Sequence, residues 1–129
     1  MYSALDIAKH VPENMRSIYY WNMSRLELMR GFSENWDDEG GMPFSPELID
    51  AVEELIADLR FQPSVSPTGR ASIQLDYGSR RKGQCYLGFE IYDNGTVSLY
   101  TKDAKGNHME KNIRIGDITT YVSDFCRTV

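Results

Sequence analysis

The chain has 129 residues, of which 41% are hydrophobic and 26% are charged. This composition is typical of one globular domain and excludes a disordered chain. No apolar run approaches the roughly 20 residues that a membrane-spanning helix needs, and residues 1–6 lack the pattern of a signal peptide. We therefore expect one domain over residues 1–129, located in the cytoplasm and without membrane contact.

The net charge of −5 is unevenly distributed. Nine of the 19 carboxylates, and no Lys or Arg, fall between Gly31 and Leu59, which we call the acidic stretch. The rest of the chain has 14 basic residues against the remaining 10 acidic ones. Direct nucleic-acid binding is therefore not favoured, because phosphate attraction requires a basic footprint.

The first half of the chain is predicted to be helical. A short helix is expected over residues 4–10, before the break at Pro12. Over residues 13–30 apolar side chains recur at steps of three and four, which is typical of an amphipathic helix. Tyr20 and Trp21 fall off the predicted buried stripe, which consists of Met15, Ile18, Tyr19, Met23, Leu26 and Met29.

A second helix is predicted to begin after Ser45 and to end near Arg60. Ser45 is a favoured N-cap residue, and Pro46 suits the first helical position because its missing N–H would have no partner there. Phe44 and Ile49 occupy the two positions of a hydrophobic staple. The predicted outer face of this helix is acidic and consists of Asp50, Glu53, Glu54 and Asp58.

Alternating apolar and polar residues in the second half predict antiparallel strands. They are expected over residues 71–77, 85–92 and 96–101, with a weaker strand over residues 109–115 and a final helix that Asp117 would cap. The fold class is therefore α+β, with N-terminal helices and a C-terminal helix packed on a three- to four-stranded antiparallel meander. The helical half would span about residues 1–61, and the sheet with the last helix about 70–129.

The turn near Asn94 can be predicted from strand register. A two-residue loop would mix apolar and polar side chains on both faces of the hairpin. A three-residue loop over 93–95 places Ile91 opposite Val97 and keeps the apolar faces together. We therefore predict the three-residue loop, with Gly95 in a left-handed conformation.

Motifs for catalysis or cofactor binding are lacking. His10 and His108 are far apart and have no neighbouring Cys, so they do not form a zinc motif. Residues 37–39 lack the alternating oxygen ligands of a calcium loop. We predict no metal, cofactor or catalytic residue, and an enzyme is the less favoured class. Cys85 and Cys126 are expected as small buried thiols and not as a disulfide.

Residues 34–47 read Glu-Asn-Trp-Asp-Asp-Glu-Gly-Gly-Met-Pro-Phe-Ser-Pro-Glu. This segment resembles a small bacterial and phage domain family whose core reads Asn-Trp-Asp-Gly-x-Gly-Ala, followed by Pro, then Ser and a helix. The resemblance covers about residues 28–101, with Asp38 where Gly is usual and Gly41 where Ala is usual. The family has no established activity, so the resemblance implies no catalytic residue. It implies a bacterial or phage origin, often near mobile elements, a context that suits small acidic inhibitors.

These features predict a non-catalytic binding protein of phage or mobile-element type. Its acidic loop and helix would occupy a basic surface on a protein partner, for example as an anti-CRISPR-like inhibitor of a host defence nuclease complex. Like charges without basic partners destabilise a fold, so a function for them is worth testing. The predicted partner-binding residues are Trp36, Asp37, Asp38, Glu39, Asp50, Glu54 and Asp58.

Two alternatives remain open. The first is a small enzyme or toxin acting on nucleic acid, with Arg80, Arg81 and Lys82 at a hairpin tip as phosphate contacts. The second is a structural homodimerisation module joined through Tyr20 and Trp21. Trp36 likewise has two interpretations, as an aromatic anchor for the partner or as a buried structural residue.

Overall fold

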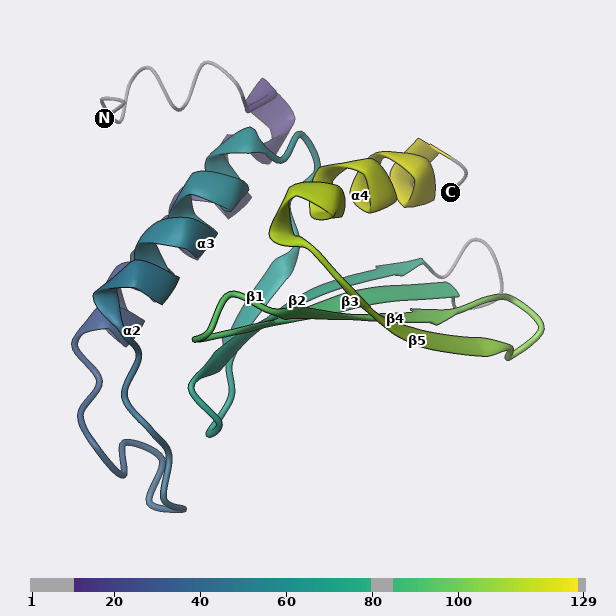
Figure 1. The fold of residues 1–129 in the computed structure, drawn as a ribbon. Helices are drawn as coiled ribbons and strands as arrows, with labels where there is room; N and C mark the ends of the chain where they lie inside the picture. The colour runs from purple at the N-terminus through teal and green to yellow at the C-terminus, as the bar shows by residue number, and fades with distance from the viewer. Residues whose placement is uncertain (1–10, 80–84, 128–129) are drawn as a thin grey trace.

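The computed structural model describes residues 11–79 and 85–127, in which helices pack on one face of a five-stranded antiparallel sheet (Figure 1). The α+β class predicted from the sequence is confirmed. The expected helix over residues 4–10 lies outside the described residues. The helical elements are η1 (Glu13–Met15), α2 (Arg16–Arg30), α3 (Pro46–Asp58), η2 (Ile115–Asp117) and α4 (Ile118–Arg127).

The strands follow one another in the sheet in the order of the chain. They are β1 (Ser64–Pro67), β2 (Ser72–Ser79), β3 (Cys85–Tyr92), β4 (Val97–Lys102) and β5 (His108–Ile113). The predicted register of the central hairpin is confirmed, because Ile91 pairs with Val97 across β3 and β4. Gly95 has a φ of 86°, and its N–H donates to the carbonyl oxygen of Tyr92 at 2.9 Å.

β1 was not expected, and the sheet therefore has five strands and begins at Ser64. Its burial pattern is short and irregular, with Val65 as its one buried residue. Pro67 also reads as a break in a sequence because it lacks an N–H. At the edge of a sheet that missing donor is tolerated, since only one side of the strand forms the ladder.

α2 differs from its predicted stripe at two positions. Ile18 was expected to be buried but is 44% exposed, whereas the polar Asn22 is buried. The side-chain amide of Asn22 donates to the carbonyl oxygen of Pro63 at 3.0 Å, ahead of β1. The buried face of α2 is therefore turned toward the sheet edge, a direction that the helix pattern alone does not contain.

The start of α3 matches the sequence prediction. The Ser45 hydroxyl accepts the backbone N–H of Leu48 at 3.1 Å, and Pro46 is the first helical residue. Phe44 and Ile49 are both buried, as the staple positions require. The helix ends at Asp58, two residues before the predicted end.

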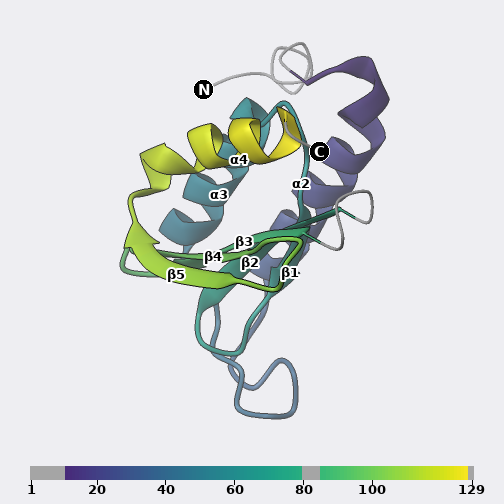
Figure 2. The same ribbon diagram turned by 90° about the vertical axis from the view of Figure 1, so that its right-hand side faces the viewer.

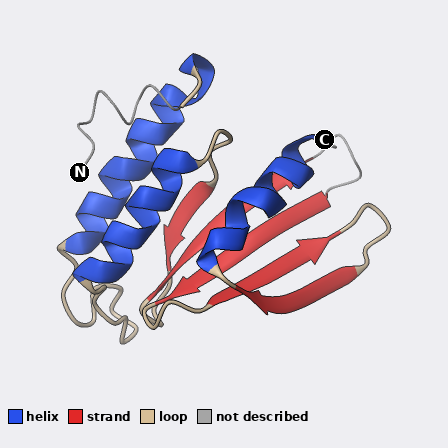
Figure 3. Ribbon diagram, turned by 45° about the horizontal axis from the view of Figure 1, so that its top comes forward, coloured by secondary structure: helices blue, strands red, loops and turns tan. Residues whose placement is uncertain are grey.

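The last helix begins differently from the prediction. Asp117 closes the short helix η2, and its carboxylate accepts the backbone N–H of Arg114 at 3.2 Å in place of capping α4. α4 then lies across the sheet and buries Ile118 and Val122 (Figure 3). Cys85 and Cys126 are half-buried thiols rather than fully buried ones.

The hydrophobic core lies between the helices and one face of the sheet. The central strands contribute side chains that are almost fully inaccessible to solvent, among them Ile73, Leu75, Phe89 and Leu99. No helix covers the other face of the sheet in the described part of the chain (Figure 1). The structure thus has two surfaces to consider, the outer side of the helices and the open face of the sheet.

Candidate acidic binding surface

The loop between α2 and α3 is held together by its own polar groups. The Asp37 carboxylate accepts the backbone N–H groups of Glu39 at 3.0 Å and Gly41 at 2.7 Å. These bonds favour the ionised form and lower the pKa of Asp37. Asn35 closes the loop, since its N–H donates to the Gly41 carbonyl oxygen at 2.7 Å. Asp37 is therefore a structural acceptor as well as a surface charge.

Trp36 is also part of the loop structure. Its ring stacks on Phe32 with 4.9 Å between the centroids and lies 6.0 Å from the ring of Phe44. The indole N–H donates to the carbonyl oxygen of Met42 at 2.8 Å. These contacts give Trp36 a structural role, although its side chain is partly buried and not fully buried as the second interpretation expected. A contact with a partner stays a prediction.

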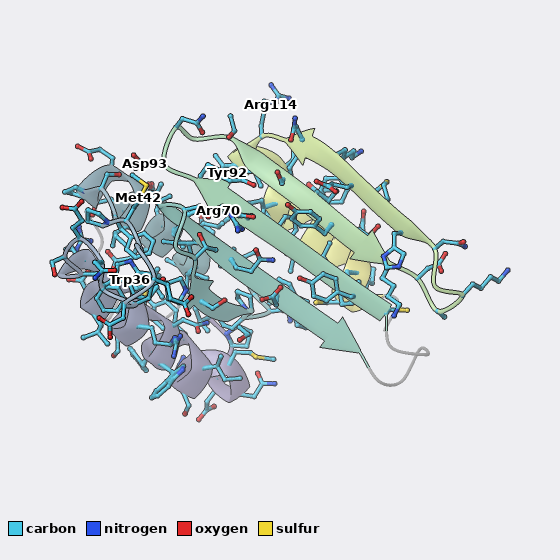
Figure 4. All side chains as sticks on the ribbon, turned by 90° about the horizontal axis from the view of Figure 1, so that it is seen from below. Trp36, Met42, Arg70, Tyr92, Asp93 and Arg114 are labelled. Carbon is cyan, nitrogen blue, oxygen red and sulfur yellow. The ribbon has the colours of Figure 1, made fainter. Side chains whose placement is uncertain are left out.

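Two further bonds attach the loop to the sheet. The N–H of Met42 donates to the carbonyl oxygen of Gly69 at 3.2 Å, in the turn between β1 and β2. The Ser45 hydroxyl bonds to the carboxylate of Asp93, in the turn between β3 and β4. Figure 4 shows Met42 beside Asp93 at this end of the sheet, with Trp36 farther from Asp93. Asp38 and Glu39 are exposed in the same loop.

The expectation that the acidic stretch has no basic partner is wrong for two residues. Arg30, the last residue of α2, lies just before the stretch and donates to Asp50 at 2.8 Å and to Glu53 at 2.5 Å. It also pairs with Glu27 at 2.9 Å within its own helix. Because α2 and α3 pack side by side, one guanidinium is shared among three carboxylates (Figure 1).

Glu53 is the least exposed member of this cluster. Burial, followed by the nearby carboxylate of Glu27, raises the pKa of Glu53 to about 7, and Arg30 only partly opposes the shift. Glu27 is more exposed, and its bond to Arg30 lowers its pKa. The raised pKa favours the neutral form of Glu53, and protonation there reduces the negative charge of the cluster.

Glu54 and Asp58 lie one turn apart on the exposed side of α3. Within residues 11–79 and 85–127, neither forms an ion pair with Lys, Arg or His. They border an open hollow of about 290 Å³, whose other walls include Leu55, Ile115 and Thr119. Among the predicted partner-binding residues on α3, Asp50 is paired with Arg30, whereas Glu54 and Asp58 have no ion-pair partner in the described part of the chain.

The open face of the sheet holds a polar network that the sequence did not reveal. Glu90 is buried although it points away from the core, and it accepts bonds from Arg70 at 2.7 Å and Ser72 at 2.5 Å. Burial opposes ionisation of Glu90, but the bonds from Ser72 and Arg70 prevail and lower its pKa. Figure 4 shows Arg70 and Tyr92 on this face. Arg70 lies in the turn between β1 and β2, and the pairing of β2 with β3 brings it to Glu90, which is 20 residues away in the sequence.

Other predicted features have less structural support. Arg80, Arg81 and Lys82 lie outside the described residues. His108 is exposed on β5. In the described ranges no group of three or more His, Cys, Asp or Glu side chains is placed to hold a metal ion. In the same ranges, no helix has the length and apolar character needed to cross a membrane.

Comparison with known proteins gave no match. No family model matches the chain, no curated protein is similar to it, and no solved structure matches its fold.

Proposed function

We propose that this is a non-catalytic binding protein that uses the outer face of α3 and the adjoining loop to occupy a basic surface on a partner protein. The observation that carries the proposal is the pair Glu54 and Asp58. These are exposed carboxylates on successive turns, without an ion-pair partner among the described residues. Like charges placed so repel each other, and a cationic partner would relieve that repulsion.

The geometry divides the predicted residues into two groups. Asp37 and Trp36 maintain the loop, and Asp50 is held by Arg30. Asp38, Glu39, Glu54 and Asp58 remain as exposed charges for a partner. Because the loop backbone is anchored to the sheet, it is ordered before a partner binds, which lowers the ordering cost of binding.

The resemblance to a bacterial and phage domain family supports a more specific form of this proposal. In that form the partner is a nucleic-acid-binding host defence protein, and the acidic surface takes the place of the nucleic acid. A carboxylate array suits this role because it presents negative charge to the Lys and Arg side chains that contact phosphates.

The test compares two double variants of equal net charge. Glu54→Lys with Asp58→Lys reverses the proposed surface. Glu13→Lys with Glu110→Lys changes two exposed residues elsewhere. Each Glu→Lys or Asp→Lys replacement raises the net charge by two, so both double variants go from −5 to −1. Wild type and both variants are immobilised, and proteins retained from a bacterial lysate are identified and then titrated in purified form.

We expect a protein retained by wild type and by the Glu13/Glu110 control but bound at least about tenfold more weakly by the Glu54/Asp58 variant. Its affinity for wild type should fall with salt. Competition by DNA or RNA would support the more specific form. Equal affinity of that protein for all three chains would refute the acidic-surface proposal.

A further inference from the structure

α2 carries a second unusual surface on its solvent side. Ile18, Trp21 and Leu28 are 44%, 63% and 67% exposed. Together with Arg25 they are spaced three, four and three residues apart, which places all four side chains in one stripe along the helix. The solvent side of a helix is normally polar, so an exposed stripe with a large aromatic residue indicates a contact surface.

The stripe is self-complementary when it is read against an antiparallel copy of itself. When two copies of α2 are aligned antiparallel about residue 23, Ile18 of one copy faces Leu28 of the other. Trp21 of one copy then faces Arg25 of the other. Each pair occurs twice about a two-fold axis near residue 23. The apolar residues therefore meet at the ends, and two indole–guanidinium pairs meet in the middle. The neighbouring Ser17 and Ser24 are small and uncharged, so they do not hinder a close approach.

The contacts of Arg25 hold its side chain in a position where it can meet Trp21 of a second copy. Its Nε donates to the carbonyl oxygen of Val65 at 3.1 Å, which holds the side chain against the outer edge of β1. Beside it lies an open hollow of about 390 Å³ between α2 and β1, with Ile18, Trp21 and Pro63 among its walls. Figure 2 shows α2 alongside β1 at this edge of the sheet. A guanidinium fixed in this way offers a planar face on which an aromatic ring can stack.

We propose that this stripe is the interface of an antiparallel homodimer, with α2 of one chain packed on α2 of a second copy. Trp21 of each chain stacks on Arg25 of the other. The interface is separate from the acidic face of α3, so it does not depend on the proposed function.

Charge substitutions at Trp21 test whether this residue faces Arg25 of the second copy. Trp21→Arg places a cation opposite Arg25 of the second copy twice, which should abolish association. Trp21→Glu places a carboxylate opposite the same Arg25, so association should be kept. Tyr20→Arg is the matched control, because Tyr20 is an exposed aromatic on the same helix outside the stripe. Far-UV circular dichroism is used to check that each variant is folded.

Sedimentation velocity over about 5 to 500 µM covers the range expected for a small interface. Wild type, Trp21→Glu and Tyr20→Arg should show a dimer whose fraction rises with concentration, and the dissociation constant for Trp21→Glu should stay within about tenfold of wild type. Trp21→Arg should remain monomeric. A wild type that is monomeric throughout, or Trp21→Arg and Trp21→Glu variants that associate equally, would overturn the proposal.

Discussion

The buried side chain of Asn22 joins α2 to the segment that leads into β1, through its 3.0 Å bond to the carbonyl oxygen of Pro63. The same amide donates to the side-chain oxygen of Gln62 at 3.2 Å. Gln62 in turn donates to the carbonyl oxygens of Ile56 and Leu59 at the end of α3. Two polar side chains, Asn22 and Gln62, thus connect α2, the end of α3 and the segment that leads into β1.

Asn22→Ala should therefore be strongly destabilising for a polar substitution. The change leaves buried acceptors without a donor, which costs about 1–3 kcal/mol in the free energy of unfolding. Urea denaturation measures it. Ser24→Ala, at an exposed position of the same helix, is the control and should change stability by less than about 0.5 kcal/mol. Equal effects of the two substitutions would mean that the Asn22 bonds contribute nothing.

Gly41→Ala should disrupt the loop that carries the acidic residues. A Cβ at this position would lie 2.6 Å from the Asp37 carboxylate oxygen and 2.8 Å from the indole nitrogen of Trp36. Relieving this overlap would break the bonds of both residues, at a cost of about 1–3 kcal/mol. Urea denaturation and the near-UV circular dichroism of Trp36 both report it.

The matched control is Gly31→Ala at the other end of the same loop. Its φ is −92°, and its Cβ would lie 3.7 Å from the nearest carbonyl oxygen. Stability should be unchanged or should rise by up to about 1 kcal/mol, because Ala restricts the unfolded chain. A Gly41→Ala variant that behaves like this control would contradict the loop geometry.

Glu53 should make stability depend on pH. Its pKa is raised from an ordinary 4.5 to about 7 in the folded protein. The folded state therefore holds the proton more tightly, and the stability gained is present below pH 4.5 and lost as the pH rises from 4.5 to 7. Relative to wild type, Glu53→Gln should become progressively more stable over that window in urea denaturation at fixed ionic strength.

Glu90→Gln is the control with the opposite sign. The pKa of Glu90 is lowered in the folded protein. Its contribution to the free energy of unfolding is therefore present above the pKa of the unfolded chain and is lost as the pH falls. The loss of stability of Glu90→Gln relative to wild type should be constant near neutral pH and should become smaller in acid. If the Glu53→Gln difference instead falls as the pH rises, the pairing with Arg30 outweighs burial at Glu53.

The sequence by itself determined the local features of this protein. Ser45 and Pro46 define the start of α3, because capping depends on side chains that are neighbours in the chain. The apolar alternation of β3 and β4 also determined the loop at Gly95, since a one-residue slip would turn every side chain to the wrong face. These predictions succeeded because each depends on residues only a few positions apart.

The tertiary structure alone decided the features that join distant segments. Pro67 reads as a break in the sequence, and only the sheet edge makes it part of a strand. Asn22 is buried and Ile18 is exposed, the reverse of what their polarity predicts, because β1 lies beside α2. Arg30 pairs with Asp50 and Glu53 because two helices pack side by side. Charge is a property of the sequence, but whether it is neutralised depends on distance, and distance between elements is fixed only by the fold.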